Sequence, residues 1–182
     1  MPDHLQIVVG VAGRIGSGKT IVAQQLANSF GFQYFRYSLI LAEWFGANPE
    51  DKGRLQEIGG GVMNGEGQLE LNRRLISQIP AGKDTVIDGL RHPLDFASLR
   101  GQFHQKFSLI FVETPADARF ERLRGRFSSF NQFEHADSRP VEANIDDLKP
   151  LASATLPGTL QKAELEAKLG SLIAGFRQKA EA

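Results

Sequence analysis

Short apolar runs alternate along the chain with stretches in which apolar residues recur at the spacing of a helix. The runs predict five strands, at 5–11, 33–37, 85–88, 107–112 and 154–156. The helical spacing predicts one helix after Thr20, another after Pro93, and others at 39–45, 71–79, 116–127, 140–151 and 165–176. Because strands that alternate with helices form mainly parallel sheets covered on both faces, the pattern predicts an α/β fold with three layers.

Two stretches interrupt this pattern. Residues 46–67 are rich in glycine and include Gly59-Gly60-Gly61, so we expect an irregular segment that covers a substrate. A long surface loop without such a role is the alternative. The polar stretch 128–138 is also predicted to be a loop, and Ser38 is expected to cap the short helix 39–45.

The first predicted strand leads into a glycine-rich stretch, Gly10-Val11-Ala12-Gly13-Arg14-Ile15-Gly16-Ser17-Gly18-Lys19-Thr20. It contains the pattern G-x-x-x-x-G-K-T between a strand and a helix, which is the context in which this pattern binds phosphate. Glycines let a polyphosphate approach the backbone, whose N–H groups then surround the anion. Lys19 can reach the outer phosphates, and the Thr20 hydroxyl can bind Mg²⁺. The alternative is a glycine-rich turn that precedes a lysine by chance.

A second group of candidate residues lies at the ends of other strands. Ligands of parallel α/β sheets bind at the carboxyl ends of the strands, which brings together the loop 13–20, Asp88 and Glu113. Asp88 can hold a water molecule of a Mg²⁺ ion or act on the proton of an acceptor; capping the next turn is the alternative. Arg91 follows closely, and its planar guanidinium is suited to contact a second phosphate.

Arginines are also concentrated further along the chain. Arg119, Arg122 and Arg126 are spaced so that they share one face of the predicted helix, and Arg139 follows the polar stretch. Phosphoryl transfer spreads negative charge over three oxygens, and arginines delivered by a closing lid stabilise that charge. A solvated basic face near the end of a helix is the alternative.

Composition excludes several classes of protein. The length of 182 residues suits a single domain, and 21 basic and 21 acidic side chains give no net charge that would favour nucleic acid or acidic membranes. The absence of cysteine excludes disulfides, thiolate chemistry and cysteine-type zinc sites. No apolar segment approaches the length of about 18 residues that a membrane helix needs, so we expect a cytoplasmic protein.

Other proteins with this phosphate-binding pattern carry signatures that are missing here. The chain has no Asn-Lys-x-Asp guanine motif and no Leu-Ser-Gly-Gly-Gln transporter motif. Gly89 follows Asp88, where motor and unfoldase ATPases usually have Glu. A small chain with a phosphate loop, an Asp-Gly turn and arginines on a lid therefore favours a small-molecule kinase.

At these residues the chain resembles the nucleoside monophosphate kinase group of P-loop proteins. The turn Asp88-Gly89-Leu90-Arg91 is similar to the Asp-Gly-Phe-Pro-Arg of adenylate kinase, with the arginine one residue closer, and 119–126 is similar to the entry into the lid of that family. A branch related to dephospho-CoA kinase and deoxynucleoside monophosphate kinases is more similar still. Its Phe-x-x-x-Asp-x-Arg-x-x-Glu pattern recurs at 133–142.

The resemblance implies a P-loop NTPase fold, a three-layer α/β/α domain over 1–182 with a mainly parallel five-stranded sheet. A flexible acceptor-side segment would span 38–80 and a small lid 126–139. The cofactors would be ATP and Mg²⁺, and the terminal phosphoryl group would pass to a nucleotide-type acceptor, a (deoxy)nucleoside monophosphate. The alternatives are dephospho-CoA kinase-like activity and a regulatory ATPase that acts on a protein partner. The phosphate acceptor is the expected partner of a monomer or homodimer, without nucleic acid or membrane.

The resemblance also assigns roles to individual residues. The ATP-binding residues would be Gly13, Arg14, Ile15, Gly16, Ser17, Gly18, Lys19, Thr20, Arg122, Pro157 and Gly158. Acceptor binding would fall to Arg36, Ser38 and Arg91, and metal binding to Thr20 and Asp88. The catalytic residues would be Lys19, Asp88, Arg122, Arg126 and Arg139.

Two positions depart from the family pattern, since His135 stands where related lids tend to have arginine and Leu156 where relatives often have asparagine.

Overall fold

The computed structural model describes residues 5–63 and 66–182. Its strands are β1 (Val8–Ala12), β2 (Gln33–Arg36), β3 (Thr85–Leu90), β4 (Phe107–Glu113) and β5 (Ala154–Pro157). They form one sheet in the order β2-β3-β1-β4-β5, and every neighbouring pair is parallel. The five predicted strands and the parallel sheet are therefore confirmed, with small differences at the strand ends.

Helices and short 3-10 turns connect the strands. The helices are α1 (Lys19–Phe30), α2 (Tyr37–Phe45), α3 (Lys52–Val62), α4 (Glu66–Gln78), α5 (Pro93–Phe103), α6 (Ala116–Arg122), α7 (Phe130–Asp137) and α8 (Lys162–Glu181). The 3-10 turns are η1 (His104–Lys106), η2 (Pro140–Glu142) and η3 (Asp146–Leu151). Within the described residues, no helix has the length and apolar composition needed to cross a bilayer.

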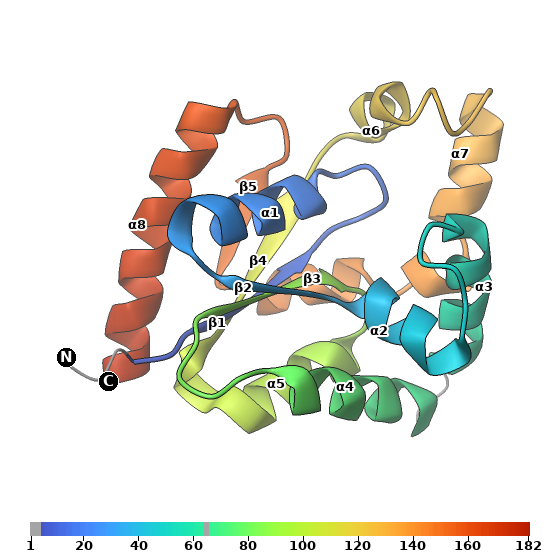
Figure 1. The fold of residues 1–182 in the computed structure, drawn as a ribbon. Helices are drawn as coiled ribbons and strands as arrows, with labels where there is room; N and C mark the ends of the chain where they lie inside the picture. The colour runs from blue at the N-terminus through green and yellow to red at the C-terminus, as the bar shows by residue number, and fades with distance from the viewer. Residues whose placement is uncertain (1–4, 64–65) are drawn as a thin grey trace.

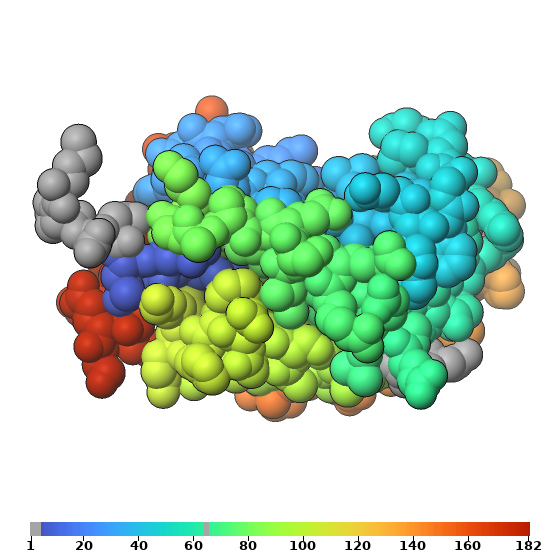
Figure 2. All heavy atoms as spheres, turned by 60° about the horizontal axis from the view of Figure 1, so that its bottom comes forward, coloured from blue at the N-terminus to red at the C-terminus, as the bar shows by residue number. Residues whose placement is uncertain are grey.

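The sheet is the middle of three layers (Figure 1). α1 and α8 cover one face, while α2, α4 and α5 cover the other. Alternate residues of β1 serve the two sides, since Val9 and Val11 pack toward α1 and α8 whereas Val8 and Ala12 pack into the opposite core. Figure 2, with α4 and α5 turned forward, shows them as one continuous layer beside α2 and α3.

The segment 38–80, predicted to lie on the acceptor side, contains a helix that the sequence did not predict. α3 runs through Gly59-Gly60-Gly61, where we predicted irregular chain; Gly65 of that prediction lies outside the described residues. Asp51 caps the helix by accepting a hydrogen bond from the Arg54 amide at 2.9 Å. Gly59 is buried, and a Cβ there would come within 3.1 Å of Val141. Glycine thus lets α3 pack closely against η2.

The predicted lid and the helix before it also differ from the expected secondary structure. The helix predicted at 116–127 ends at Arg122, so Arg126 does not share a helix face with Arg119. The predicted loop 128–138 contains α7 instead, which Ser129 caps at its N-terminus. Aromatic contacts of Phe133 with other lid phenylalanines hold α7 against α6.

Two further predictions were wrong in detail. The helix expected at 140–151 is two short 3-10 turns, η2 and η3. α2 begins at Tyr37, so Ser38 lies inside its first turn and does not cap it.

Candidate active site

The phosphate loop between β1 and α1 has the backbone conformation that its glycines allow. Gly13, Gly16 and Gly18 have φ angles of 155°, 76° and 95°, a region that residues with a Cβ rarely adopt. Gly18 is the N-cap of α1, and Lys19 is the first residue of that helix. The loop therefore precedes a free helix N-terminus, which is an arrangement suited to bind phosphate.

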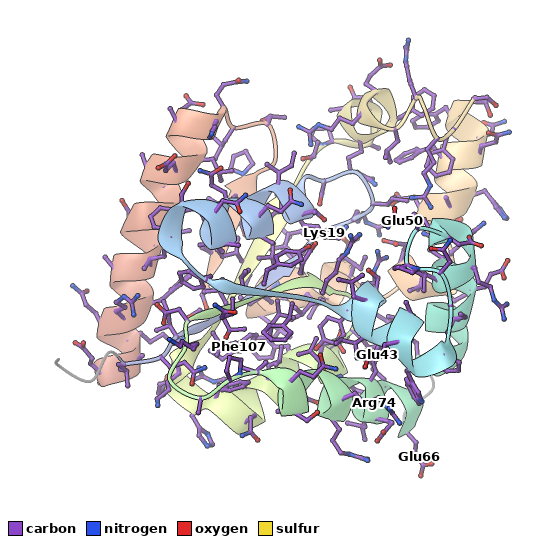
Figure 3. The ribbon with its side chains drawn as sticks, viewed as in Figure 1. Lys19, Glu43, Glu50, Glu66, Arg74 and Phe107 are labelled. Carbon is purple, nitrogen blue, oxygen red and sulfur yellow. The ribbon has the colours of Figure 1, made fainter. Side chains whose placement is uncertain are left out.

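Lys19 lies at the centre of the molecule, between α1 and the side occupied by α2 and α3 (Figure 3). Its Nζ donates a hydrogen bond of 3.4 Å to the carbonyl oxygen of Arg14. Burial, together with nearby cations such as Arg91, lowers the pKa of Lys19 to about 7. Such a site holds excess positive charge, and a polyphosphate would relieve it.

Asp88 of β3 lies beside the start of α1. Its Oδ2 accepts hydrogen bonds from the hydroxyls of Thr20 and Tyr34, both at 2.8 Å, and Arg36 Nε lies 3.8 Å away. Tyr34 and Arg36 are two residues apart on β2, so both side chains point to the same side of that strand. The Thr20 hydroxyl and the carboxylate form the oxygen pair expected at a phosphate-bound metal ion.

The residues present fit Mg²⁺. Asp88 Oδ1 is buried and has no hydrogen-bond partner, while Asp88 itself is 1% exposed. Such an orphaned carboxylate oxygen is unfavourable unless a cation or proton reaches it. The described residues include no cluster of three acidic or histidine side chains, but Mg²⁺ held by phosphates and waters needs only one or two protein oxygens.

Arg91 is held by two carboxylates, those of Glu142 and Asp95. Its guanidinium forms an ion pair with Glu142, which is fully buried, and burial lowers the pKa of Arg91 to about 10. Asp95 accepts hydrogen bonds from the Arg91 and His92 backbone amides, both at 3.0 Å. Burial raises the pKa of Asp95, which these hydrogen bonds oppose. The turn after β3 is thus fixed from both sides.

A cavity of about 240 Å³ connects these groups. Lys19, Thr20 and Asp88 line it, and so do Arg36, Arg91 and Arg126. Much of the remaining wall is apolar and comes from α2, α3, α4 and η2: Leu41, Leu55, Met63, Leu71 and Val141. The cavity therefore combines a cationic part with a surface suited to the face of a ring.

The lid arginines have different surroundings. Arg119 is buried and donates to both carboxylate oxygens of Asp137, at 2.7 and 3.0 Å, so it supports the lid. Arg126 lines the cavity, whereas Arg122 and Arg139 are not among its lining residues. Arg122 instead donates to backbone carbonyls of the phosphate loop and to that of Gly158, the latter at 2.7 Å.

The other predicted residues are placed as follows. Ser38 lines the cavity and its buried Oγ has no partner, which leaves it available to an acceptor. Gly158 packs directly against the Ser17 backbone. The side chain of Arg14 is ion-paired with Asp146 at 2.8 Å. Ile15 is buried and forms part of the cavity wall.

Glu113 lies near the phosphate loop, as predicted, because it lines a second cavity together with Arg14 and Ser17. It does not share a cavity with Asp88, and it pairs with Lys149 at 2.7 Å.

Sequence reasoning assigned no role in this site to Tyr34, Gln56, Gln68, Asp95 or Glu142. Tyr34 could have been found from its spacing of two residues before Arg36 in a predicted strand. Asp95 could have been recognised as a capping residue two positions after Pro93. Glu142 is the glutamate of the Phe-x-x-x-Asp-x-Arg-x-x-Glu pattern at 133–142, but the pattern does not show that it pairs with Arg91. For Gln56 the local sequence holds no signal, because its partners come from distant segments.

Comparison with known proteins supports the fold. No family model matches the chain. A UPF0200 protein of Aeropyrum pernix is 24% identical over 185 residues, which cover 96% of this chain and 97% of that protein.

Among solved structures, shikimate kinase from Acinetobacter baumannii in complex with shikimate is similar with a TM-score of 0.58 and 18% identity, over 94% of this chain and 95% of that one. A gluconokinase from Sinorhizobium meliloti gives 0.59 and 17%, over 98% and 95%. A putative kinase from Chloroflexus aurantiacus gives 0.62 and 15%, over 94% and 98%. The chain therefore has the fold of P-loop kinases.

Proposed function

We propose that this protein is an ATP- and Mg²⁺-dependent small-molecule kinase that phosphorylates a nucleotide-type acceptor, a ribo- or deoxyribonucleoside monophosphate. One observation carries the proposal: a single cavity joins Lys19 and Asp88 to Arg36 and Arg91 and then to an apolar wall. The arginines suit the phosphate of the acceptor, and the apolar wall suits the face of its base.

The apolar composition of that wall also favours one chemical class of acceptor over another. Shikimate kinase and gluconokinase, which share the fold, are named for acceptors rich in hydroxyl groups. Hydroxyls buried against Leu41, Leu55 and Leu71 would lose hydrogen bonds to water without replacement. A planar base can place its face on such a wall and keep its polar edge toward groups such as Gln68.

In the proposed reaction, the loop amides and Lys19 bind the outer phosphates of ATP. Thr20 and Asp88 would hold Mg²⁺, which neutralises charge on the phosphates when it is bound. Asp88 Oδ1, which has no protein partner, is the atom available to the metal ion or to the proton of the acceptor. Arg36 and Arg91 orient the acceptor, and Arg126 adds positive charge where negative charge develops.

The test is an ATP-consumption screen in Mg²⁺ with a defined panel: ribo- and deoxynucleoside monophosphates, dephospho-CoA, shikimate, gluconate and no acceptor. We expect a nucleoside monophosphate to stimulate turnover at least about tenfold over the acceptor-free rate. Stimulation by shikimate or gluconate alone would support kinase activity but would reject a nucleotide-type acceptor. ATP binding without stimulation by any acceptor would reject the kinase in favour of a regulatory ATPase.

A further inference from the structure

Arg126 and Arg139 differ from the other arginines of the lid. Arg119 is neutralised by its ion pair with Asp137. For Arg126 and Arg139, the described part of the chain offers no carboxylate within ion-pair distance. Both instead donate a hydrogen bond to the same atom, Gln56 Oε1, at 3.3 and 2.9 Å.

Gln56 is a buried residue of α3, next to Leu55 of the apolar wall, and it lines the cavity together with Arg126. Its amide oxygen can accept two hydrogen bonds but carries no charge. Two guanidinium groups are therefore held side by side without being neutralised. Partial burial, together with the charge of Arg139, lowers the pKa of Arg126, as expected for adjacent like charges.

A neutral residue at this place has a specific consequence. A carboxylate would hold the two arginines more tightly but would cancel their charge. The glutamine fixes their position and leaves both charges uncancelled, with Arg126 lining the cavity and Arg139 next to it on the same glutamine oxygen. Because Gln56 belongs to the acceptor-side helix and both arginines come from the lid segment, the same contact links these two parts.

We propose that Gln56 is a positioning residue that holds Arg126 and Arg139 as an unneutralised cationic pair for the anionic groups bound in the cavity. The inference rests on the proposed function for its kinetic readout, but its anion-binding readout is independent of any acceptor.

The test compares Gln56→Glu with wild type in three measurements: the affinity for inorganic pyrophosphate, kcat with the acceptor found in the screen, and the melting temperature. We expect the melting temperature to stay level or rise, because two ion pairs replace two hydrogen bonds. Pyrophosphate affinity and kcat should each fall about tenfold or more, because the pair is neutralised. Gln132→Glu, an exposed change of the same kind on α7, controls for added charge and should match wild type in all three.

The outcomes separate the two proposals. Unchanged pyrophosphate affinity in Gln56→Glu would overturn the inference, whatever the activity. Weakened pyrophosphate binding in a protein that phosphorylates no acceptor would support the role of Gln56 and reject the kinase. Weakened binding with unchanged kcat would also overturn the inference, because the pair would then serve no bound reactant.

A second variant keeps the test valid if Gln56→Glu folds poorly. Gln56→Met removes the shared acceptor atom without adding charge, so Arg126 and Arg139 lose their common anchor. We expect kcat and pyrophosphate affinity to fall by about threefold to tenfold. Wild-type values for both would show that the glutamine does not position the arginines.

Discussion

Lys19 is the residue whose chemistry depends most on its surroundings. With its pKa lowered to about 7 by burial and neighbouring cations, it is partly neutral at physiological pH when no anion is present. A bound polyphosphate would restore its charge, so binding is expected to take up a proton above pH 7. The cations around Lys19 therefore disfavour one another, and a bound anion would reduce that repulsion.

The free-energy cost of a charged Lys19 in the folded protein predicts that Lys19→Met is more stable than wild type. Since the pKa of Lys19 is lower in the folded protein than its ordinary value of 10.5, its unfavourable contribution is full below pH 7 and fades as the pH rises from 7 to 10.5. Lys19→Met should therefore raise the free energy of unfolding most at pH 6 and least near pH 10, while phosphoryl transfer is lost. Urea denaturation across this range measures the difference. A stabilisation that does not vary with pH would contradict the assignment.

Removing Arg91 from its ion pair with Glu142 should lower the stability of the protein, whereas Lys19→Met should raise it. Arg91→Leu leaves Glu142 buried without its partner, which should lower the free energy of unfolding by about 3 kcal/mol. The double variant Arg91→Leu/Glu142→Leu should recover most of this loss, because no unpaired charge remains. Urea denaturation of the four members of this cycle provides the measurement. A loss in the double variant equal to the sum of the losses in Arg91→Leu and Glu142→Leu would show that the pair is not coupled.

At the scale of elements, close backbone packing holds the phosphate loop in place. Gly158 follows β5, and a Cβ at this position would collide with the Ser17 carbonyl and the Thr114 hydroxyl. The backbone of the loop after β5 therefore lies in direct contact with the phosphate loop. The two loops can be this close only because residue 158 has no side chain.

We therefore predict that Gly158→Ala destabilises the protein by about 1–3 kcal/mol through overpacking and weakens ATP binding. Gly101→Ala is the matched control, because nothing lies within 4 Å of the added Cβ and alanine favours the interior of α5. Thermal melting and ATP titration of both variants test this. A Gly158→Ala protein as stable as the control would show that the loops can separate at no cost.

The elements also show what could be predicted from the sequence. The strands and α1 follow from apolar periodicity and the glycine pattern, which are local properties of the chain. α3 was missed because Gly59-Gly60-Gly61 has a low intrinsic helix propensity, which the Asp51 cap, the buried Leu55 and Val62 and the packing of Gly59 on Val141 outweigh. Lys19 and Asp88 were identifiable by motif and strand end, whereas Gln56 could be identified only from its contacts in three dimensions.

For the whole molecule, ligand binding should be visible as stability. A ligand that binds only the folded state at 100 times its Kd adds about 2.7 kcal/mol, which for a chain of this size raises the melting temperature by about 5–10 °C. We predict such a shift with Mg²⁺ and ATP, a much smaller one with ATP and EDTA, and none for Lys19→Met. Equal shifts with and without EDTA would contradict metal binding by Thr20 and Asp88.

Both ends of the lid are fastened to the phosphate loop. At the start, Arg122 donates to the carbonyl oxygens of Gly16 and Ser17, and at the end Asp137 is paired with Arg14. If this segment closes over a nucleotide as we propose, it cannot rotate about a single hinge while both contacts persist. We therefore expect its closing movement to be short, and a nucleotide that changed the conformation of the phosphate loop would displace both attachment points together.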